Sequence, residues 1–146
     1  EGSVFVADTH NHQILKLVQA KQEDRVVYKT EIIIGCGQHG FADGDIKTAR
    51  FAFPHGITWK SNQLFVADTN NHKIRKVDLE RHTVETIAGS CAGYLDGKCI
   101  SAHFDHPRGL CLDKSGNILV CDTGNYLIRR IIMRNKTVET VAGSTY

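Results

Sequence analysis

Three aspartates are the first side chains in this sequence that could do chemistry, because each stands in a copy of one repeated motif. The copies read VFVADTHNHQILKL at 4–17, LFVADTNNHKIRKV at 64–77 and ILVCDTGNYLIRRI at 118–131. The aspartates are Asp8, Asp68 and Asp122. A catalytic carboxylate pair does not need one member per repeat, so we interpret all three as structural. We expect each to accept hydrogen bonds from backbone N–H groups of the turn that follows it.

The side chains after each aspartate are polar or imidazole groups that repeat with it. Asn11, Asn71 and Asn125 occupy one slot, which we interpret as structural. His12 and His72 occupy the next slot, and we expect them to serve in turns or in packing between repeats. The third copy has Tyr126 there, and a phenol is a poor substitute for imidazole as a metal ligand. The pattern therefore predicts no metal site and no cofactor.

Every copy lies within a longer repeat that carries four strand signals. Gly35, Gly89 and Gly143 follow one another at intervals of 54 residues, but Asp68 follows Asp8 by 60, which places about six extra residues within 18–31. Short runs rich in Val, Ile, Thr and Phe, bounded by Gly, Asn, Asp and Ser, predict strands. The predicted strands are 56–59, 64–68, 73–79, 83–88, 109–113, 118–122, 127–133 and 137–142. Four antiparallel strands per repeat of this length predict an all-β fold, the β-propeller, with one blade per repeat.

The motif resembles the NHL repeat, a family named for its Asn-His-Leu signature. The segments 5–12 and 65–72 carry this resemblance, together with Pro54-His55-Gly56-Ile57 and Pro107-Arg108-Gly109-Leu110 at the start of a blade. The third copy departs from it at Gly124-Asn125-Tyr126 and at Cys121. The resemblance implies that the turn 69–72 and the loops 35–53 and 89–106 share one face of the propeller.

The sequence holds about two and three-quarter blades, fewer than the four to eight that close a propeller. We expect an incomplete blade at 1–34, a blade at 35–88, and a blade plus the start of the next inter-blade loop at 89–146. An open ring leaves sheet edges bare. We therefore expect the remaining blades to come from the same chain or from another chain.

Slots that change between blades are better candidates for ligand contact than slots that repeat. His55 and Arg108 occupy one such slot, between Pro and Gly just before the strand that would line the central channel. Arg50 and His103 occupy a second, in the inter-blade loops. We predict that these four residues contact a ligand or partner. The neighbouring Ala49-x-Phe51 and Ala102-x-Phe104 repeat, and we expect them to plug the loop onto its blade.

Charge and composition exclude some partners and leave others open. The net charge is +2 in 146 residues, and no apolar stretch approaches the ~20 residues of a membrane span. Basic residues gather in the third strand of each blade, where we expect them to protect flanks and edges. They are Lys73, Arg75, Lys76, Arg129 and Arg130. RNA binding stays possible but is not favoured, because glutamates dilute this charge and no aromatic platform is interleaved with it.

Five cysteines occur without a C-x-x-C spacing, which argues against a zinc site or a dense disulfide framework. Cys111 and Cys121 lie in strand-like runs, and we expect them to be buried. Cys91 and Cys99 share a loop, so a bridge between them stays open. Asn135 begins an N-x-T sequon that matters only in a secreted protein.

The favoured function is a non-catalytic scaffold that presents loops to a protein partner, because the sequence contains no recognisable catalytic motif. The resemblance also implies alternatives from other classes. Some related propellers hold calcium or zinc in the central channel for lyase or hydrolase chemistry, and His55, His103 and His106 would then be the ligands to test. Other relatives bind RNA.

Overall fold

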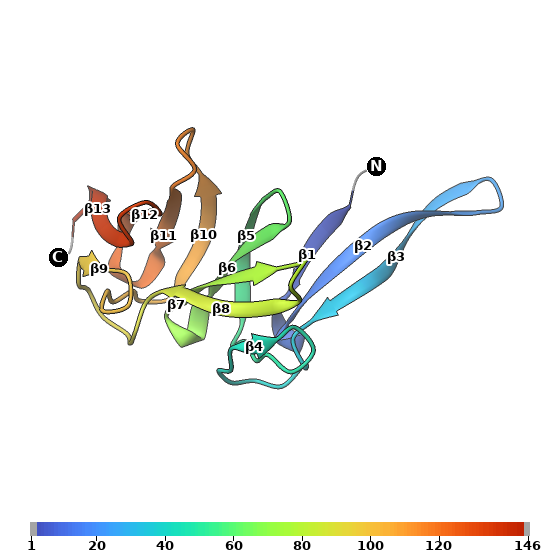
Figure 1. Ribbon diagram of the computed structural model, residues 1–146, viewed down its shortest axis with the longest axis horizontal. Coiled ribbons are helices and arrows are strands. Elements are labelled where there is room, and N and C mark those ends of the chain that lie inside the picture. Colours follow the sequence, from blue (N-terminus) through green and yellow to red (C-terminus); the bar gives the residue numbers. More distant parts are fainter. Residues whose placement is uncertain (1–2, 145–146) are drawn as a thin grey trace.

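The computed structural model describes residues 3–144, in which strands form three antiparallel sheets (Figure 1). Residues 1–2 and 145–146, the ends of the first and last expected units, lie outside the described residues. The first sheet has the order β1-β2-β3, with β1 Val4–Asp8, β2 Gln13–Gln22 and β3 Arg25–Ile34. The second has the order β4-β8-β7-β6-β5, with β4 Gly44–Asp45, β5 Pro54–Lys60, β6 Gln63–Asp68, β7 Lys73–Asp78 and β8 Thr83–Ala88. The third has the order β10-β11-β12-β13-β9, with β9 Gly97–Lys98, β10 Pro107–Leu112, β11 Ile118–Asp122, β12 Leu127–Ile132 and β13 Thr137–Gly143.

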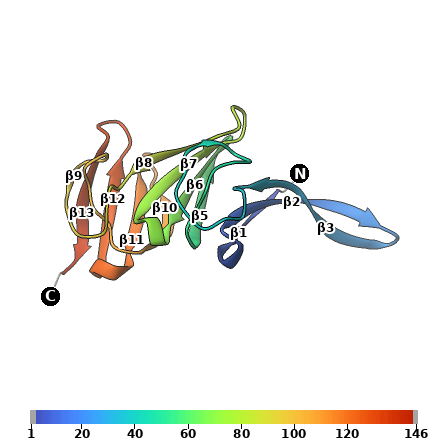
Figure 2. The ribbon, with the colours of Figure 1, turned by 90° about the horizontal axis from the view of Figure 1, so that it is seen from below.

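The three sheets follow one another like blades, and β5, the first strand of the second blade, packs against both of its neighbours (Figures 1 and 2). Strand β5 lies against β10 on one side and against β1 on the other. Gly56 marks the close approach, since a Cβ at this position would lie 2.0 Å from the carbonyl oxygen of Arg108. A side chain there would push the two blades apart, which gives the glycine of Pro54-His55-Gly56 its physical reason. The predicted all-β fold, a partial propeller ring, is confirmed.

A short 3-10 turn joins the second and third strands of every blade. These turns are η1 Thr9–Asn11, η2 Thr69–Asn71 and η3 Thr123–Asn125. Each ends on a residue in the left-handed conformation, His12, His72 or Tyr126, with φ of 55°, 54° and 58°. That conformation is uncommon for residues other than glycine, so the turn is a specified feature of the repeat.

The hydrophobic core lies between the blades. One cluster joins Phe65, Ala67 and Ile74 of the second sheet to Ile118 and Val120 of the third. A second cluster joins Ile14 and Ile34 of the first sheet to Leu64, Val66 and Val77. The expected Ala-x-Phe plugs are confirmed, because Phe51 and Phe104 are fully buried in these two clusters.

The hairpin of β2 and β3 is longer than its counterparts. Each of its strands has ten residues, whereas β7 and β8 have six each. The extra residues expected within 18–31 thus lengthen both strands, and the hairpin extends well beyond the rest of its sheet (Figures 1 and 2). Strand β1 pairs with β2 only over Gln13–Leu17, so the outer half of the hairpin is two-stranded.

The prediction that Cys111 and Cys121 are buried is wrong. Both are exposed, because strand alternation turns them away from the half-buried Leu110 and Leu112 and from the buried Val120 and Asp122. Cys99 is the buried cysteine instead. Cys91 and Cys99 are separate free thiols, the first exposed and the second buried.

Candidate functional site

The repeated aspartates tie each turn to the inter-blade loop. Asp68 is fully buried, and its carboxylate accepts hydrogen bonds from the Ala52 N–H at 2.7 Å and from the Asn71 amide at 2.8 Å. Asp122 is buried in the same way and accepts from the Asp105 N–H and the Asn125 amide. The prediction that backbone N–H groups of the following turn donate to the aspartate is wrong. The 3-10 turn receives no side-chain cap, since the backbone donor comes from the loop that precedes the blade.

A buried arginine completes the cluster in the second blade. The Arg75 side chain is fully buried and donates to Asp68 at 2.5 Å and to Asp43 at 2.7 Å. It also donates to the carbonyl oxygens of Arg50 and Ala42. Its guanidinium lies between the rings of Phe41 and Phe51, 4.8 and 5.0 Å from their centroids. Arg75 therefore fastens the inter-blade loop to its blade.

The third blade repeats this cluster atom for atom. Arg129 is fully buried, donates to Asp122 at 2.6 Å and to Asp96 at 2.7 Å, and lies between Tyr94 and Phe104. The prediction that third-strand basic residues protect flanks and edges is thus wrong for Arg75 and Arg129. The signal that could have identified them is the shared spacing of seven residues between aspartate and arginine.

The first blade lacks the arginine, because Leu15 stands in its slot. Asp8 there is only half-buried and accepts from Asn11 and Gln13. These two amide hydrogen bonds lower the pKa of Asp8. Burial instead raises the pKa of Asp68, although the charge of Arg75 and the hydrogen bonds from the Ala52 N–H and Asn71 act to lower it. The same motif therefore produces two electrostatic environments, and the aspartate is fully buried only in the blades that also have the buried arginine.

The repeated histidines each accept a backbone hydrogen bond across a blade junction. His12 Nδ1 accepts from the Phe53 N–H at 3.3 Å, and His72 Nδ1 accepts from the His106 N–H at 3.2 Å. Burial is the main cause that lowers the pKa of both histidines. A neutral imidazole is the form that can accept at Nδ1.

The variable slots lie on exposed or half-buried positions near the blade starts. His55 and Arg108 are exposed at the beginning of β5 and β10, the strands that meet at Gly56. His55 Nδ1 contacts the Phe53 carbonyl and the Thr69 hydroxyl, at 2.9 and 3.0 Å.

The second variable slot lies in the loops. Arg50 is exposed, and His103 is half-buried with Nε2 3.4 Å from the Cys91 sulfur. The carbonyl oxygens of Arg50 and His103 accept from the two buried arginines. The backbone at this slot is thus structural, while the side chains are free to differ.

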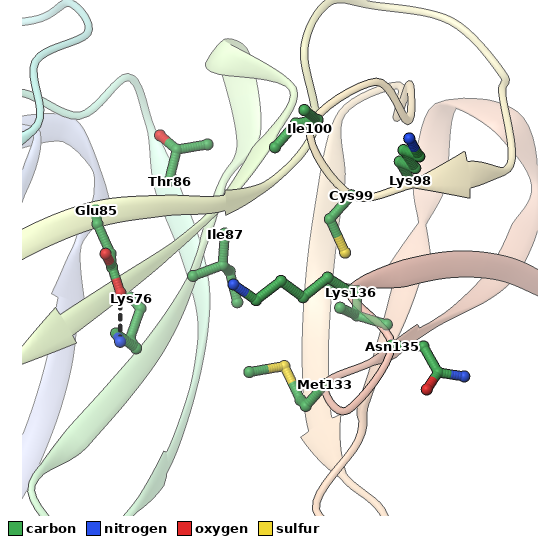
Figure 3. A pocket seen from close by; sticks show the side chains of 11 residues that line it. Lys76, Glu85, Thr86, Ile87, Lys98, Cys99, Ile100, Met133, Asn135 and Lys136 are labelled. Atoms are coloured by element: carbon green, nitrogen blue, oxygen red, sulfur yellow. Dashed lines mark ion pairs between the residues drawn. The ribbon is translucent and has the colours of Figure 1, made fainter.

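A pocket of about 470 Å³ lies between the second and third blades (Figure 3). Its apolar wall is made by Ile87, Cys99, Ile100, Ile131 and Met133. The side chains of Lys76, Lys98 and Lys136 also line it, and Lys76 is paired with Glu85 (Figure 3). Sequence reasoning missed this pocket, because its walls come from separate blades.

The model of the NHL repeat matches residues 51–77 and 104–131, which cover the blade start, the aspartate turn and the third strand of two blades. The chain belongs to the NHL-repeat family. NHL repeat-containing protein 2 of Bos taurus is 37% identical over 108 residues, which are 68% of this chain and 15% of that protein. Protein SUPPRESSOR OF QUENCHING 1, chloroplastic, of Arabidopsis thaliana is 31% identical over 131 residues, 87% of this chain and 12% of that protein. This NHL segment thus spans a small part of its relatives' length.

Solved structures share the fold of this NHL segment. An auxiliary nutrient binding protein from Bacteroides thetaiotaomicron matches with a TM-score of 0.74 at 23% identity, over 94% of this chain and 35% of that chain. One from Bacteroides ovatus matches with a TM-score of 0.75 at 20% identity, over 96% of this chain and 35% of that chain. At such identities the likeness concerns the fold alone. Within residues 3–144, no helix is long and apolar enough to cross a membrane.

The NHL blades also weaken the case for RNA. Of the five basic residues in the third strands, Arg75 and Arg129 have no exposed side chain, and Lys76 and Arg130 are paired with Glu85 and Glu139. Phosphate contacts need accessible cations. NHL repeats are generally protein-interaction modules.

Proposed function

We propose that this segment is a non-catalytic scaffold of a propeller, which binds a protein segment carrying an apolar residue flanked by carboxylates. The pocket between the second and third blades carries the proposal (Figure 3). The repeated aspartates and their arginines are occupied in holding loops to blades, which leaves the surface between blades for recognition.

The apolar wall suits an inserted side chain. Ile100 is 79% exposed beside the pocket, although isoleucine is more often buried. Exposed apolar surface with a polar rim is typical of protein-interaction sites. An apolar anchor of the partner would cover Ile100 and fill the space toward Ile87 and Met133.

The rim selects the charge of the partner. Lys98 and Lys136 line the pocket, and within the described part of the chain neither forms an ion pair with a carboxylate. Opposite charge on the partner raises the association rate and rejects basic segments. Acidic residues on both sides of the apolar anchor complement these two lysines.

The equivalent pocket at the preceding junction has a different charge pattern. It has a volume of about 650 Å³ and includes Glu31, Asp45, Lys47 and His82. Asp45 and Lys47 stand in the slots that Lys98 and Ile100 occupy one blade later. The preceding pocket also has an exposed isoleucine, Ile33, and a lysine, Lys47, but the carboxylates of Glu31 and Asp45 line it too. Two lysines without an ion-pair partner beside an exposed isoleucine therefore distinguish the second junction.

The experiment is selection of displayed peptides on the full-length chain. The proposal expects enriched peptides with an apolar residue between Asp or Glu residues, and a fall in their affinity of about tenfold or more in Lys98→Glu/Lys136→Glu. The matched control Lys47→Glu changes the other junction and should leave affinity unaltered. Equal binding to the Lys98→Glu/Lys136→Glu variant would contradict the pocket.

The loop face remains a second candidate contact surface for the same scaffold. We propose that His55, Arg108, Arg50 and His103 contribute to it, and the selected peptides can be tested against His55→Ala/Arg108→Ala. Loss of binding only in that variant would move the partner site from the pocket to the blade starts.

The remaining blades are part of the proposal. The expected units 1–34, 35–88 and 89–146 amount to an open ring, which we expect to be completed by the same chain or another. A stable monomer of the 146-residue segment in gel filtration would contradict this expectation.

A further inference from the structure

Three metal-ligating side chains converge where the second blade meets the third. They are His72 at the end of η2, and Asp105 and His106 just before β10. Their ligand atoms all lie within 4.8 Å of one another. Asp105 Oδ1 is 3.4 Å from His72 Nδ1 and 2.7 Å from His106 Nδ1. All three side chains are partly exposed, so an ion can reach them.

This cluster does not repeat. At the preceding junction the slots of Asp105 and His106 hold Ala52 and Phe53, and His12 packs edge-on against the Phe53 ring at 4.6 Å. The third blade also makes room for the carboxylate, since Gly124 replaces Asn70 and lies against Asp105. Asp105, His106 and Gly124 thus distinguish this junction from the preceding one. A function confined to one junction requires such differences, whereas a packing role repeated in every blade does not.

We infer that His72, Asp105 and His106 bind a divalent ion of the zinc class. Zinc bonds of ~2.0–2.1 Å in a tetrahedron place neighbouring ligand atoms ~3.3–3.4 Å apart, the spacing found between His72 Nδ1 and Asp105 Oδ1. The 2.7 Å between Asp105 Oδ1 and His106 Nδ1 must lengthen by about 0.6 Å to reach this spacing, and His106 is half-exposed, so its ring can move outward.

The donor set selects the ion. Two imidazole nitrogens and one carboxylate suit zinc and its transition-metal neighbours, whereas calcium and magnesium prefer several oxygens. Three protein ligands leave a fourth position for water or for a side chain of a partner. Binding would thus add a fixed positive charge at the junction of the two blades.

One contact competes with the ion. His72 Nδ1 accepts the His106 N–H at 3.2 Å, and His12 makes the same bond to Phe53 without a cluster. The ion takes the Nδ1 lone pair of His72 in place of that N–H. If His72 serves only the turn, zinc does not bind at this junction, and zinc titration of variants at the three residues distinguishes the two roles.

The test is calorimetric titration of the chelator-washed full-length chain with zinc chloride. The decisive variant is Asp105→Ala/His106→Phe, because it installs the residues of the preceding junction and should fold. We expect saturable binding that weakens on the order of 100-fold or more in this variant and in His72→Asn. His55→Ala and His103→Ala should leave the affinity unchanged, which excludes a site built from the variable slots.

Cobalt(II) gives a second readout. Its visible absorption in a four-coordinate nitrogen and oxygen site should appear with the native chain and vanish in Asp105→Ala/His106→Phe. Zinc affinity that is unaltered in that variant, or an absence of saturable binding to the native chain, would overturn the inference. Because these readouts involve no peptide, they are independent of the proposed scaffold function.

Discussion

Gly124 lacks a side chain at the point in the third blade where the Asp105 carboxylate needs the space. The Gly124 N–H donates to the Asp105 carbonyl oxygen at 2.7 Å, and a Cβ on Gly124 would lie 2.5 Å from Oδ2 of the same aspartate. In the preceding blade Asn70 donates to the Ala52 carbonyl at 3.0 Å, so a side chain is tolerated where the loop residue is small. In the third blade the loop residue is larger, Asp105 in place of Ala52, and the turn residue is smaller, Gly124 in place of Asn70.

We therefore expect Gly124→Asn, which restores the residue of the preceding copy, to destabilise the protein by about 1–3 kcal/mol through overpacking. The added Asp105→Ala should recover part of the loss, since the carboxylate clash disappears while the close carbonyl oxygen remains. Urea unfolding of both variants and of Asp105→Ala alone completes a double-mutant cycle. Additive effects would mean that the two residues are not coupled.

Arg75 should be among the most costly side chains to remove. Its loss leaves Asp68 fully buried without its cation, and breaking a buried pair in this way costs about 3–5 kcal/mol. We expect Arg75→Leu, which copies the first blade, to lower the free energy of unfolding by that amount in urea. The double variant Asp68→Asn/Arg75→Leu should be more stable than Arg75→Leu alone, because the unpaired charge is gone. A cost below about 1 kcal/mol for Arg75→Leu would refute the assigned role.

The local sequence pattern predicted the strands and turns, but it did not predict the side-chain clusters around Arg75 and around His72. The runs at 64–68 and 118–122 are apolar and end at Asp, and the β-branched run at 83–88 is followed by Gly89, so β6, β8 and β11 were predictable to within a residue. Arg75 was misread, because its burial depends on Asp43, 32 residues away in a loop that returns to the blade. The zinc-class cluster was missed for the same reason, since His72 and Asp105 meet only when two blades stack.

Acid should weaken the first blade junction through His12. Burial, followed by the positive charges of His39 and His10, lowers its pKa in the folded chain from 6.5. The unfolded chain then binds a proton before the folded chain does, so stability falls as pH drops below about 6.5 toward the folded pKa. Protonation would also set a ring N–H against the Phe53 N–H.

The measurement is the free energy of unfolding in urea between pH 8 and pH 5, for the native chain and for His12→Asn. Asparagine tolerates the left-handed conformation of this position but does not titrate. We expect a shallower decline for the variant. Parallel curves for the two proteins would show that His12 does not contribute.

Cysteine alkylation should separate Cys99 from the other four thiols. Cys99 is buried in the core between blades, and burial raises the pKa of its thiol, whereas the thiolate is the species that reacts. Iodoacetamide at pH 8 should label Cys36, Cys91, Cys111 and Cys121 first, and Cys99 only on unfolding. Mass spectrometry of digests over time gives the rates. Native labelling of Cys99 as fast as that of Cys36 would contradict the packing.

The outer half of the long hairpin should open far more readily than the blades. Beyond Leu17 it has only two strands, and Val26 and Tyr28 are more than one-third exposed on it. An isolated two-stranded hairpin is at best marginally stable in water, and local opening is easiest where buried apolar contacts are few. Hydrogen exchange should therefore find amides of 19–28 exchanging orders of magnitude faster than those of β6 and β7, whose strands lie inside a five-stranded sheet. Shortening the hairpin to the length of β7 and β8 by replacing 19–28 with the loop sequence of 79–82 keeps the pairing of Val18 with Lys29 and should leave the unfolding midpoint in urea nearly unchanged. Protection in 19–28 equal to that of β7 would mean that another part of the full-length chain covers this hairpin, and the replacement would then lower the midpoint.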